Sequence, residues 1–287
     1  MSASSTSAAA SGSFELGRDL LVHRLGYGTM QLPGPGVWGE PSDRGEAIRT
    51  LRRAVELGIN LFDTADSYGP FVAEDLLREA LHPYDGLTIA TKGGLVRPGP
   101  GEWDSVGRPG YLRQCVEMSL RRLRVETIDL YQLHRIDPQV PVEDQLGVLA
   151  DMKAAGKIRH IGLSEVDVDQ IEQARKITEI VSVQNLYNLA NRSAEPVLEY
   201  CEREGLGFIP WFPLANRELT RPDGPLAPIA EDVGATPIQL ALAWLLHRSP
   251  VMLPIPGTSS QEHLNENVGA ASIKLSDEQG RRLEDLS

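Results

Sequence analysis

Ile59-Asn60-Leu61-Phe62-Asp63-Thr64-Ala65-Asp66-Ser67-Tyr68-Gly69 is an apolar run that passes without a break into a polar loop. Residues 59–62 have the length and apolar content of a buried strand. Before them, Asp43 and Glu46 predict the start of an amphipathic helix, and Gly58 predicts its end. Helix, strand and polar loop in this order indicate one unit of a repeating α/β fold.

The same alternation continues along the whole chain. Short apolar runs separated by amphipathic helical stretches are typical of a parallel sheet built through β-α crossovers. The predicted strands are residues 25–28, 59–62, 88–91, 128–133, 160–163, 181–184, 207–211 and 252–255. Eight strands predict closure into a (β/α)8 TIM barrel, an α/β fold that takes about 250 residues as one domain.

The helices and both ends of the chain complete this organisation. The helices after the first are predicted at residues 73–81, 109–123, 142–155, 168–177, 194–203, 237–247 and 261–270, with a last short one capped by Ser276 and Gln279. Residues 14–16 and 20–22 flank a Gly-Arg-Asp turn and predict an N-terminal β-hairpin at the barrel bottom. The Ser/Ala-rich residues 1–13 are expected to be a disordered tail, and residues 14–287 to form the barrel domain.

The rival fold is a doubly wound open sheet with a glycine-rich phosphate loop. Gly34, Gly36 and Gly39 match G-x-G-x-x-G, but that fingerprint must run directly from a strand into a helix. Prolines interrupt the segment, and no helix is predicted before about Asp43. We therefore interpret it as a loop over the barrel mouth.

Composition excludes several function classes. The net charge of −12 disfavours nucleic-acid partners, and no apolar run approaches the roughly 20 residues of a membrane span. Cys115 and Cys201 lie far apart without a metal-ligand or disulfide pattern, so they are expected to be reduced thiols of a cytoplasmic protein. Residues 1–12 have no basic or apolar segment of a secretory signal. The sequence does not choose between a monomer and a homo-oligomer.

Chemically useful side chains follow the predicted strands. Asp63, Lys92, His134, Ser164 and Gln184 come directly after the second to sixth strands, and Tyr68 lies five residues beyond the first of them. Barrel active sites lie at the carboxyl ends of the strands, so these groups are expected to meet. A phenol, an ammonium, a carboxylate and an imidazole together suit the protonation of a carbonyl that receives hydride.

These motifs resemble the aldo-keto reductases, from about Phe14 to the C-terminus. The resemblance is carried by Asp63-Thr64-Ala65-x-x-Tyr68-Gly69, Thr91-Lys92, Leu133-His134, Ile161-Gly162-Leu163-Ser164 and Ile255-Pro256-Gly257-Thr258. It implies a (β/α)8 barrel that binds NAD(P)H without a Rossmann domain. It also implies Tyr68 as general acid, supported by Asp63, Lys92 and His134.

Physical chemistry supports these roles. A phenol has an ordinary pKa near 10, and a nearby Lys92 ammonium is expected to lower it by favouring the phenolate. Asp63 would keep Lys92 charged and oriented, and His134 would hydrogen-bond the substrate oxygen. The hydride must come from a nicotinamide, because no protein side chain can donate one.

The resemblance also implies the cofactor contacts. Ser164 and Gln184 would hold the nicotinamide carboxamide, Trp211 would stack on its ring, and the N-terminus of the helix at 261–270 would bind phosphate. The full set expected to bind the cofactor is Gly28, Thr29, Met30, Asp63, Ser164, Gln184, Trp211, Phe212, Pro213, Leu214, Ile255, Gly257, Thr258, Ser259, His263, Glu266 and Asn267.

The chain departs from the family pattern at three positions in or beside this set of cofactor contacts. Glu165 stands where many members have Asn, and its carboxylate is expected to change the polarity near the carboxamide. Gly257 and His263 replace the Lys and Arg with which many members bind the 2′-phosphate. NADPH is the predicted cofactor, with NADH as the alternative.

The substrate is expected to be a small carbonyl compound bound by Tyr68, His134, Trp103 and Trp38. For Trp38, packing within its own loop is as well supported by the sequence as contact with the substrate. Residues 255–267 are similar to the branch that includes bacterial pyridoxal reductases, so pyridoxal joins small aromatic aldehydes among the expected substrates.

Two other functions were weighed. A redox-sensing accessory subunit would resemble the β subunits of potassium channels, which keep the same fold and bind NADPH, but no partner-binding extension is recognisable here. A metal-dependent barrel hydrolase needs several His, Asp or Glu residues at strand ends, and only Asp63 and His134 qualify. No metal site is predicted.

Overall fold

A curved parallel sheet forms the centre of the molecule. The computed structural model describes residues 6–215, 220–221 and 223–286. Seven strands pair in the order β11-β10-β9-β8-β5-β4-β3, so each crossover adds the next strand beside the previous one. They are β3 (Tyr27–Gly28), β4 (Leu61–Asp63), β5 (Thr88–Gly93), β8 (Ile128–Leu133), β9 (Ile158–Ser164), β10 (Ser182–Leu186) and β11 (Gly207–Trp211).

Residues 251–255 close the sheet into a barrel without forming a regular strand. The Phe208 N–H donates to Val251 at 2.9 Å, and the Leu253 N–H donates to Phe208 at 2.8 Å. On the other side, the Gly26 N–H donates to Pro254 at 2.9 Å. The (β/α)8 barrel is confirmed, but the predicted eighth strand is only a bridged segment, because Pro254 lacks the N–H that a continuous ladder needs.

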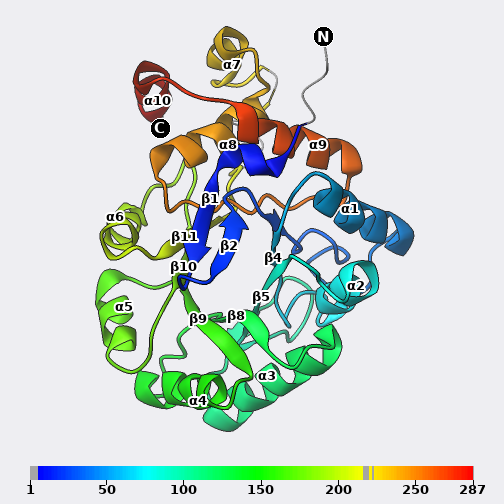
Figure 1. The fold of residues 1–287 in the computed structure, drawn as a ribbon, viewed down its shortest axis with the longest axis vertical. Helices are drawn as coiled ribbons and strands as arrows, with labels where there is room; N and C mark the ends of the chain where they lie inside the picture. The colour runs from blue at the N-terminus through cyan, green and yellow to red at the C-terminus, as the bar shows by residue number, and fades with distance from the viewer. Residues whose placement is uncertain (1–5, 216–219, 222, 287) are drawn as a thin grey trace.

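Helices surround the sheet, as Figure 1 shows. The predicted ones are found, to within a few residues, as α1 (Arg44–Glu56), α2 (Val72–Leu81), α3 (Pro109–Leu123), α4 (Val142–Ala154), α5 (Val168–Arg175), α6 (Glu195–Glu204), α8 (Pro237–Arg248), α9 (Gln261–Gly269) and α10 (Asp277–Glu284). Among the α-helices of the described residues, only α7 (Ala227–Val233) was not expected. Within the described residues, the helices lack the length and apolar character needed to cross a bilayer.

The predicted hairpin covers the amino ends of the barrel strands, where Figure 1 shows it over the centre of the ring. It consists of β1 (Ser13–Leu16) and β2 (Leu20–His23), paired antiparallel. Leu16 and Val22 are fully buried in a cluster with interior barrel residues such as Leu130 and Ile209. Because the hairpin closes this end, the opposite, carboxyl end is the one left for a ligand.

Part of the expected tail has a defined structure. Ala8–Ser11 form a 3-10 helix, Ala8 is fully buried, and its N–H donates to Leu57 at 2.8 Å. The Ser11 hydroxyl accepts from the Leu25 N–H at 3.0 Å. Small side chains let this segment pack closely against the barrel, so the expected disorder is wrong for it. Residues 1–5 lie outside the described residues.

Two loops cover the carboxyl end. Residues 34–39 remain a loop, as predicted, and the Gly39 N–H donates to Gly69 at 2.6 Å. The long loop after β5 contains a small hairpin, β6 (Leu95–Val96) and β7 (Asp104–Ser105). The Arg97 guanidinium donates to the carbonyls of Val37 and Ser67, each at 2.8 Å. One arginine therefore ties the two mouth loops to the loop that carries Tyr68.

Candidate active site

A buried lysine forms the centre of the site. Lys92, at the end of β5, is 0% exposed. Its Nζ donates to Asp63 Oδ1 at 2.5 Å, to the Thr64 carbonyl at 2.9 Å and to Tyr68 Oη at 3.2 Å. The three predicted residues are therefore brought together by the adjacent strands β4 and β5 and the loop after β4.

The second oxygen of Asp63 is held from across the barrel. Gln184 Nε2 donates to Asp63 Oδ2 at 2.8 Å, and Gln132 Nε2 donates to the same atom at 3.0 Å. Gln132 was not predicted, although an amide inside the apolar run 128–133 is a signal that this side chain faces a polar interior. The carboxylate is thus fixed by groups from β5, β8 and β10.

The electrostatic balance differs between Lys92 and Tyr68. Burial alone would lower the pKa of Lys92, but Asp63 and Tyr68 together raise it above its ordinary value. Burial raises the pKa of Tyr68, and this outweighs the lowering by Lys92. The expected lowering of the Tyr68 pKa is therefore wrong for the protein alone, because the sequence did not reveal how deeply the phenol is buried. Tyr68 is a neutral phenol that carries its proton beside a cation.

His134 supplies an uncharged imidazole. Burial, followed by the positive charges of Lys92, Arg135 and Arg97, lowers its pKa well below the ordinary histidine value. Its Nδ1 lies 3.3 Å from Ser67 Oγ, and its ring centroid is 6.0 Å from that of Tyr68. A neutral imidazole beside a phenol can hydrogen-bond a carbonyl oxygen without competing for the proton.

Trp103 is the tryptophan that reaches the phenol. Its ring centroid lies 6.3 Å from that of Tyr68 and 6.4 Å from that of His134. The Arg97 guanidinium stacks 3.6 Å above the Trp103 ring and lies 5.7 Å from the centroid of Trp38. Trp103 thus forms an apolar wall beside the Tyr68 phenol, whereas Trp38 is joined to Trp103 through Arg97, which the sequence did not predict.

The two residues expected at the nicotinamide carboxamide are joined to charged neighbours. Gln184 belongs to the Asp63 network, and Ser164 Oγ accepts from Arg135 Nη1 at 2.9 Å. Glu165 Oε1 accepts from Trp211 Nε1 at 2.6 Å and from the Leu186 N–H at 2.7 Å. The unusual Glu165 therefore fixes the indole expected to stack on the cofactor.

The first strand and the closing segment meet closely at their backbones. A Cβ on Gly28 would lie 2.7 Å from the Ile255 carbonyl oxygen, and one on Gly257 would lie 2.6 Å from the Gly28 oxygen. The Tyr27 hydroxyl donates to the Thr258 carbonyl. Glycine is needed at both positions, and the tyrosine ties the approach to α9 to the barrel.

The start of α9 is open on one side. Ser260 caps the helix, and its Oγ accepts from the His263 N–H at 3.4 Å. Ser259 and His263 are exposed, Glu266 is half-buried, and Asn267 is buried. An exposed helix N-terminus with small neighbours can bind a phosphate group.

The remaining expected cofactor residues line the same end. Phe212 is 44% exposed after β11, with Pro213 buried and Leu214 half-buried beside it. Met30 packs against the cluster that contains the Tyr68 phenol, and the Thr29 hydroxyl is buried without a partner among the described residues.

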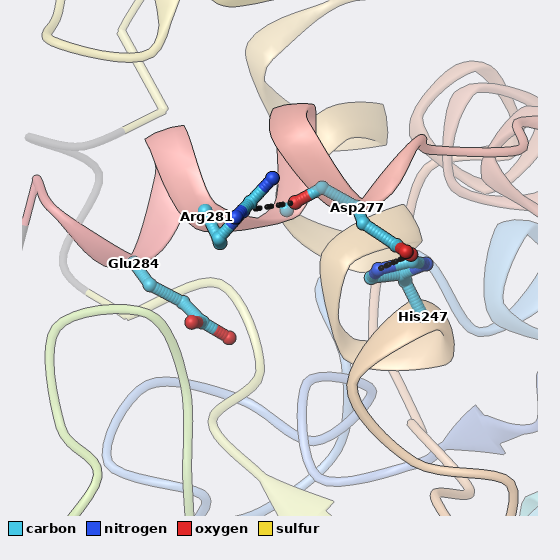
Figure 2. Close-up of a pocket in the computed structure, with 5 residues that line it drawn as sticks. His247, Asp277, Arg281 and Glu284 are labelled. Carbon is cyan, nitrogen blue, oxygen red and sulfur yellow. Dashed lines mark hydrogen bonds and ion pairs between the residues drawn. The ribbon is translucent and has the colours of Figure 1, made fainter.

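Other chemistry-bearing groups lie elsewhere. Figure 2 shows a surface pocket of about 340 Å³ between α8 and α10, with His247, Asp277, Arg281 and Glu284 as its charged or titratable lining. None of the predicted site residues lines it. Throughout the described ranges, no three His, Cys, Asp or Glu side chains are grouped so as to hold a metal ion.

Comparison with known proteins agrees with this geometry. The model of the "Aldo/keto reductase family" matches residues 24–287. The chain belongs to the aldo/keto reductase family. An uncharacterized oxidoreductase of Schizosaccharomyces pombe is 56% identical over 98% of this chain and 92% of its own length. Pyridoxine 4-dehydrogenase of Escherichia coli is 45% identical, over 93% of this chain and 95% of its own.

A solved structure of this family shares the fold and shows the cofactor type. The aldo/keto reductase of Klebsiella pneumoniae in complex with NADP and acetate has a TM-score of 0.79 and 28% identity, covering 96% of this chain and 94% of that chain. Family members use NAD(P)H as cofactor and act as oxidoreductases, so this aldo/keto reductase is an enzyme of carbonyl and alcohol chemistry.

Behind the Tyr68 loop of this reductase lies a buried acidic residue that sequence reading missed. Asp66 is 3% exposed, and its Oδ1 has no partner among the described residues. Burial and the negative charge of Glu74 raise the Asp66 pKa to about 7. Glu74 itself pairs with Arg122 at 2.5 Å. Asp66 is therefore a carboxyl that the fold favours in its protonated form.

We expect this carboxyl to lower stability as the pH rises. Below about pH 4, Asp66 is protonated in both the folded and the unfolded chain; between about 4 and 7 only the unfolded chain releases the proton. Asp66→Asn should therefore gain stability relative to wild type by roughly 1 kcal/mol per pH unit up to about pH 7, and then level off. Urea unfolding from pH 5.5 to 9 measures this.

The exposed Asp85→Asn is the matched control for that experiment. Its difference from wild type should stay constant with pH. The same constancy for Asp66→Asn would contradict the raised pKa.

Proposed function

We propose that this chain is an NADPH-dependent reductase of aldehydes and ketones, with Tyr68 as the general acid. The observation that supports it most is the contact of Tyr68 Oη with the Lys92 ammonium at 3.2 Å, beside a neutral His134. A protonated phenol, a cation to stabilise its anion and an uncharged hydrogen-bond donor are the groups that carbonyl reduction requires.

The residues divide the work as follows. A bound NADPH would supply the hydride, and the residues of this chain supply the proton and hold the reacting groups. Tyr68 Oη transfers its proton to the carbonyl oxygen, and the phenolate left behind is stabilised by Lys92. Asp63 keeps Lys92 charged, at 2.5 Å. His134 orients the carbonyl oxygen, and Trp103 excludes water from the reacting atoms. One hydride and one proton convert the carbonyl to an alcohol.

The residues present fit a nicotinamide nucleotide. Trp211 is a half-buried indole held by Glu165, and the buried Thr29 hydroxyl has no partner among the described residues. The close contact of Gly28 and Gly257 with neighbouring backbone fixes the turns after the first strand and after the closing segment, which flank the proposed site. Ser164, Gln184 and Trp211 would hold the nicotinamide. Phe212, Pro213, Leu214, Ile255, Thr258, Ser259, His263, Glu266 and Asn267 would hold the rest, between β11 and α9.

The substrates proposed are small aromatic aldehydes, with pyridoxal among them. The 45% identical relative from Escherichia coli is named pyridoxine 4-dehydrogenase, and Trp103 offers a flat apolar wall beside the acid. Relatives named as oxidoreductase and dehydrogenase favour turnover over the role of an accessory subunit.

Replacement of the acid is the direct test. Tyr68→Phe should lower kcat for pyridoxal or benzaldehyde by about 10²- to 10⁴-fold, because the proton donor is lost while packing is kept. NADPH oxidation at 340 nm, together with the Kd of NADPH, separates catalysis from binding. Tyr84→Phe, before β5 at the far end of the barrel, should keep wild-type kcat. If Tyr68→Phe turned over every aldehyde as fast as the wild-type protein, the proposal would be overturned.

Cofactor preference is tested by paired titrations with NADPH and NADH. We expect NADPH to bind at least about tenfold more tightly, because hydrogen bonds to a charged 2′-phosphate contribute about 1.5–3 kcal/mol. His263→Ala should reduce the difference, whereas His247→Ala, in the pocket of Figure 2, should not. Equal Kd values for the two nucleotides in the wild-type protein would contradict NADPH preference.

A further inference from the structure

Arg135, directly after His134 at the end of β8, carries a charge that the protein does not neutralise. It is half-buried, and both hydrogen bonds of its side chain leave from Nη1, to Ser164 Oγ at 2.9 Å and to the His134 carbonyl at 2.6 Å. Within the described residues, no carboxylate oxygen lies in ion-pair distance of this guanidinium. Partly buried charges are normally paired, so this one is unusual.

The other cations near the acid are fully engaged. Lys92 is paired with Asp63 at 2.5 Å, and Arg97 donates to the carbonyls of Val37, Ser67 and Glu102, each at 2.8 Å. Arg97, like Arg135, has no carboxylate oxygen in ion-pair distance among the described residues, but its Nε, Nη1 and Nη2 all donate hydrogen bonds. Arg135 differs because its Nε and Nη2 donors are unused.

The rest of the Arg135 guanidinium is not completely buried. In the described part of the chain, the fully buried polar atoms that lack a partner include no nitrogen of Arg135, although its Nε and Nη2 donate no hydrogen bond. These two groups therefore keep some contact with solvent. Five N–H donors in a planar fork suit a carboxylate or phosphate better than any neutral group.

The neighbouring acidic residue does not fill this place. Glu165, one strand along, attracts Arg135, but its Oε1 accepts from Trp211 and from the Leu186 N–H. The anion must come from a ligand.

The cofactor phosphates are placed on the opposite side of the ring. Arg135 follows β8, the fourth barrel strand, whereas the segment before α9 is the eighth. An anion at Arg135, next to His134, is thus most readily part of the carbonyl substrate.

We propose that Arg135 forms an anion subsite, so that this enzyme prefers carbonyl substrates that carry a carboxylate or phosphate group. The inference rests on the proposed reductase function and adds the substrate class. Arg135 binds the anionic group, while Tyr68 and His134 act on the carbonyl.

Matched substrate pairs test the subsite. 4-Carboxybenzaldehyde and its methyl ester differ by the carboxylate charge, and pyridoxal 5′-phosphate and pyridoxal differ by a phosphate. Arg135→Met should lower kcat/KM for at least one anionic member by about 10- to 100-fold, chiefly through KM. The neutral members should change by less than about threefold, and Arg135→Lys should recover part of the loss. The substrate pair in which only the anionic member loses kcat/KM shows whether the subsite binds a carboxylate or a phosphate.

Arg113→Met is the matched control. Arg113 is an exposed arginine on α3, and its substitution removes the same charge far from the mouth. Arg113→Met should leave the ratio of kcat/KM between the anionic and the neutral member of each pair at its wild-type value. An equal loss for both members of each pair with Arg135→Met would overturn the subsite, since it would show only that Arg135 positions Ser164 and His134. No loss for any substrate would overturn it as well.

A binding measurement separates this inference from the proposed function. The dissociation constants of 4-(hydroxymethyl)benzoate and its methyl ester are measured with the NADP⁺-saturated protein, where no turnover is needed. The acid should bind about tenfold more weakly to Arg135→Met, and the ester should not. If no aldehyde is reduced but this difference persists, the reductase function fails and the anion subsite stands. Equal effects on acid and ester would reject the subsite.

Discussion

The Asp63–Lys92 ion pair is the interaction on which the rest of the site depends. Burying two opposite charges costs several kcal/mol per ion unless further hydrogen bonds compensate. Here the compensation is complete: both carboxylate oxygens accept, from Lys92 on one side and from Gln132 and Gln184 on the other, and Nζ donates three times. Four barrel strands must therefore be correctly placed before Lys92 can contact Tyr68.

The same burial that excludes water makes the phenol a weaker acid. It raises the pKa of Tyr68 despite the adjacent ammonium, and it keeps His134 neutral. The structure resolves this conflict by concentrating positive charge at the mouth of a chain whose net charge is −12. In the proposed mechanism Lys92 stabilises the phenolate and Arg135 attracts an anionic group, while Arg97 fixes the mouth loops. Three cations, Lys92, Arg97 and Arg135, thus lie at the mouth of a barrel whose overall charge is negative.

Sequence predicted the residues whose place follows from a simple rule. Asp63, Lys92, His134, Ser164 and Gln184 lie at or next to the carboxyl ends of strands, and parallel strands in a barrel bring such positions to one end. The alternation of apolar runs and helical stretches also predicted seven strands, and the Gly-Arg-Asp turn predicted the hairpin. It failed at residues 252–255, where proline removes the donors of a ladder, and at Ala8–Ser11, where small side chains form a packed 3-10 helix rather than a tail.

The residues that sequence missed act through contacts between distant parts of the chain. Gln132 lies 69 residues from the Asp63 carboxylate it binds. Arg97 joins loops 60 and 30 residues away. Glu165 was expected to act near the carboxamide, but its contact with Trp211, at a separation of 46 residues, was not predicted. The direction of the Tyr68 pKa likewise depends on burial depth, which strand-end position does not reveal. Pattern identified the chemical groups, and packing determined their charge states.

The protonation of Lys92 tests the central claim most directly. Lysine labelled with ¹³C at Cε reports this charge by NMR as the pH is raised, in the wild-type protein and in Asp63→Asn. Wild-type Lys92 should keep its charge to a pH above the ordinary lysine pKa, and in Asp63→Asn burial should bring its pKa below that value. The same pKa in both proteins would contradict the account, because Asp63 would then not be what holds the buried ammonium charged.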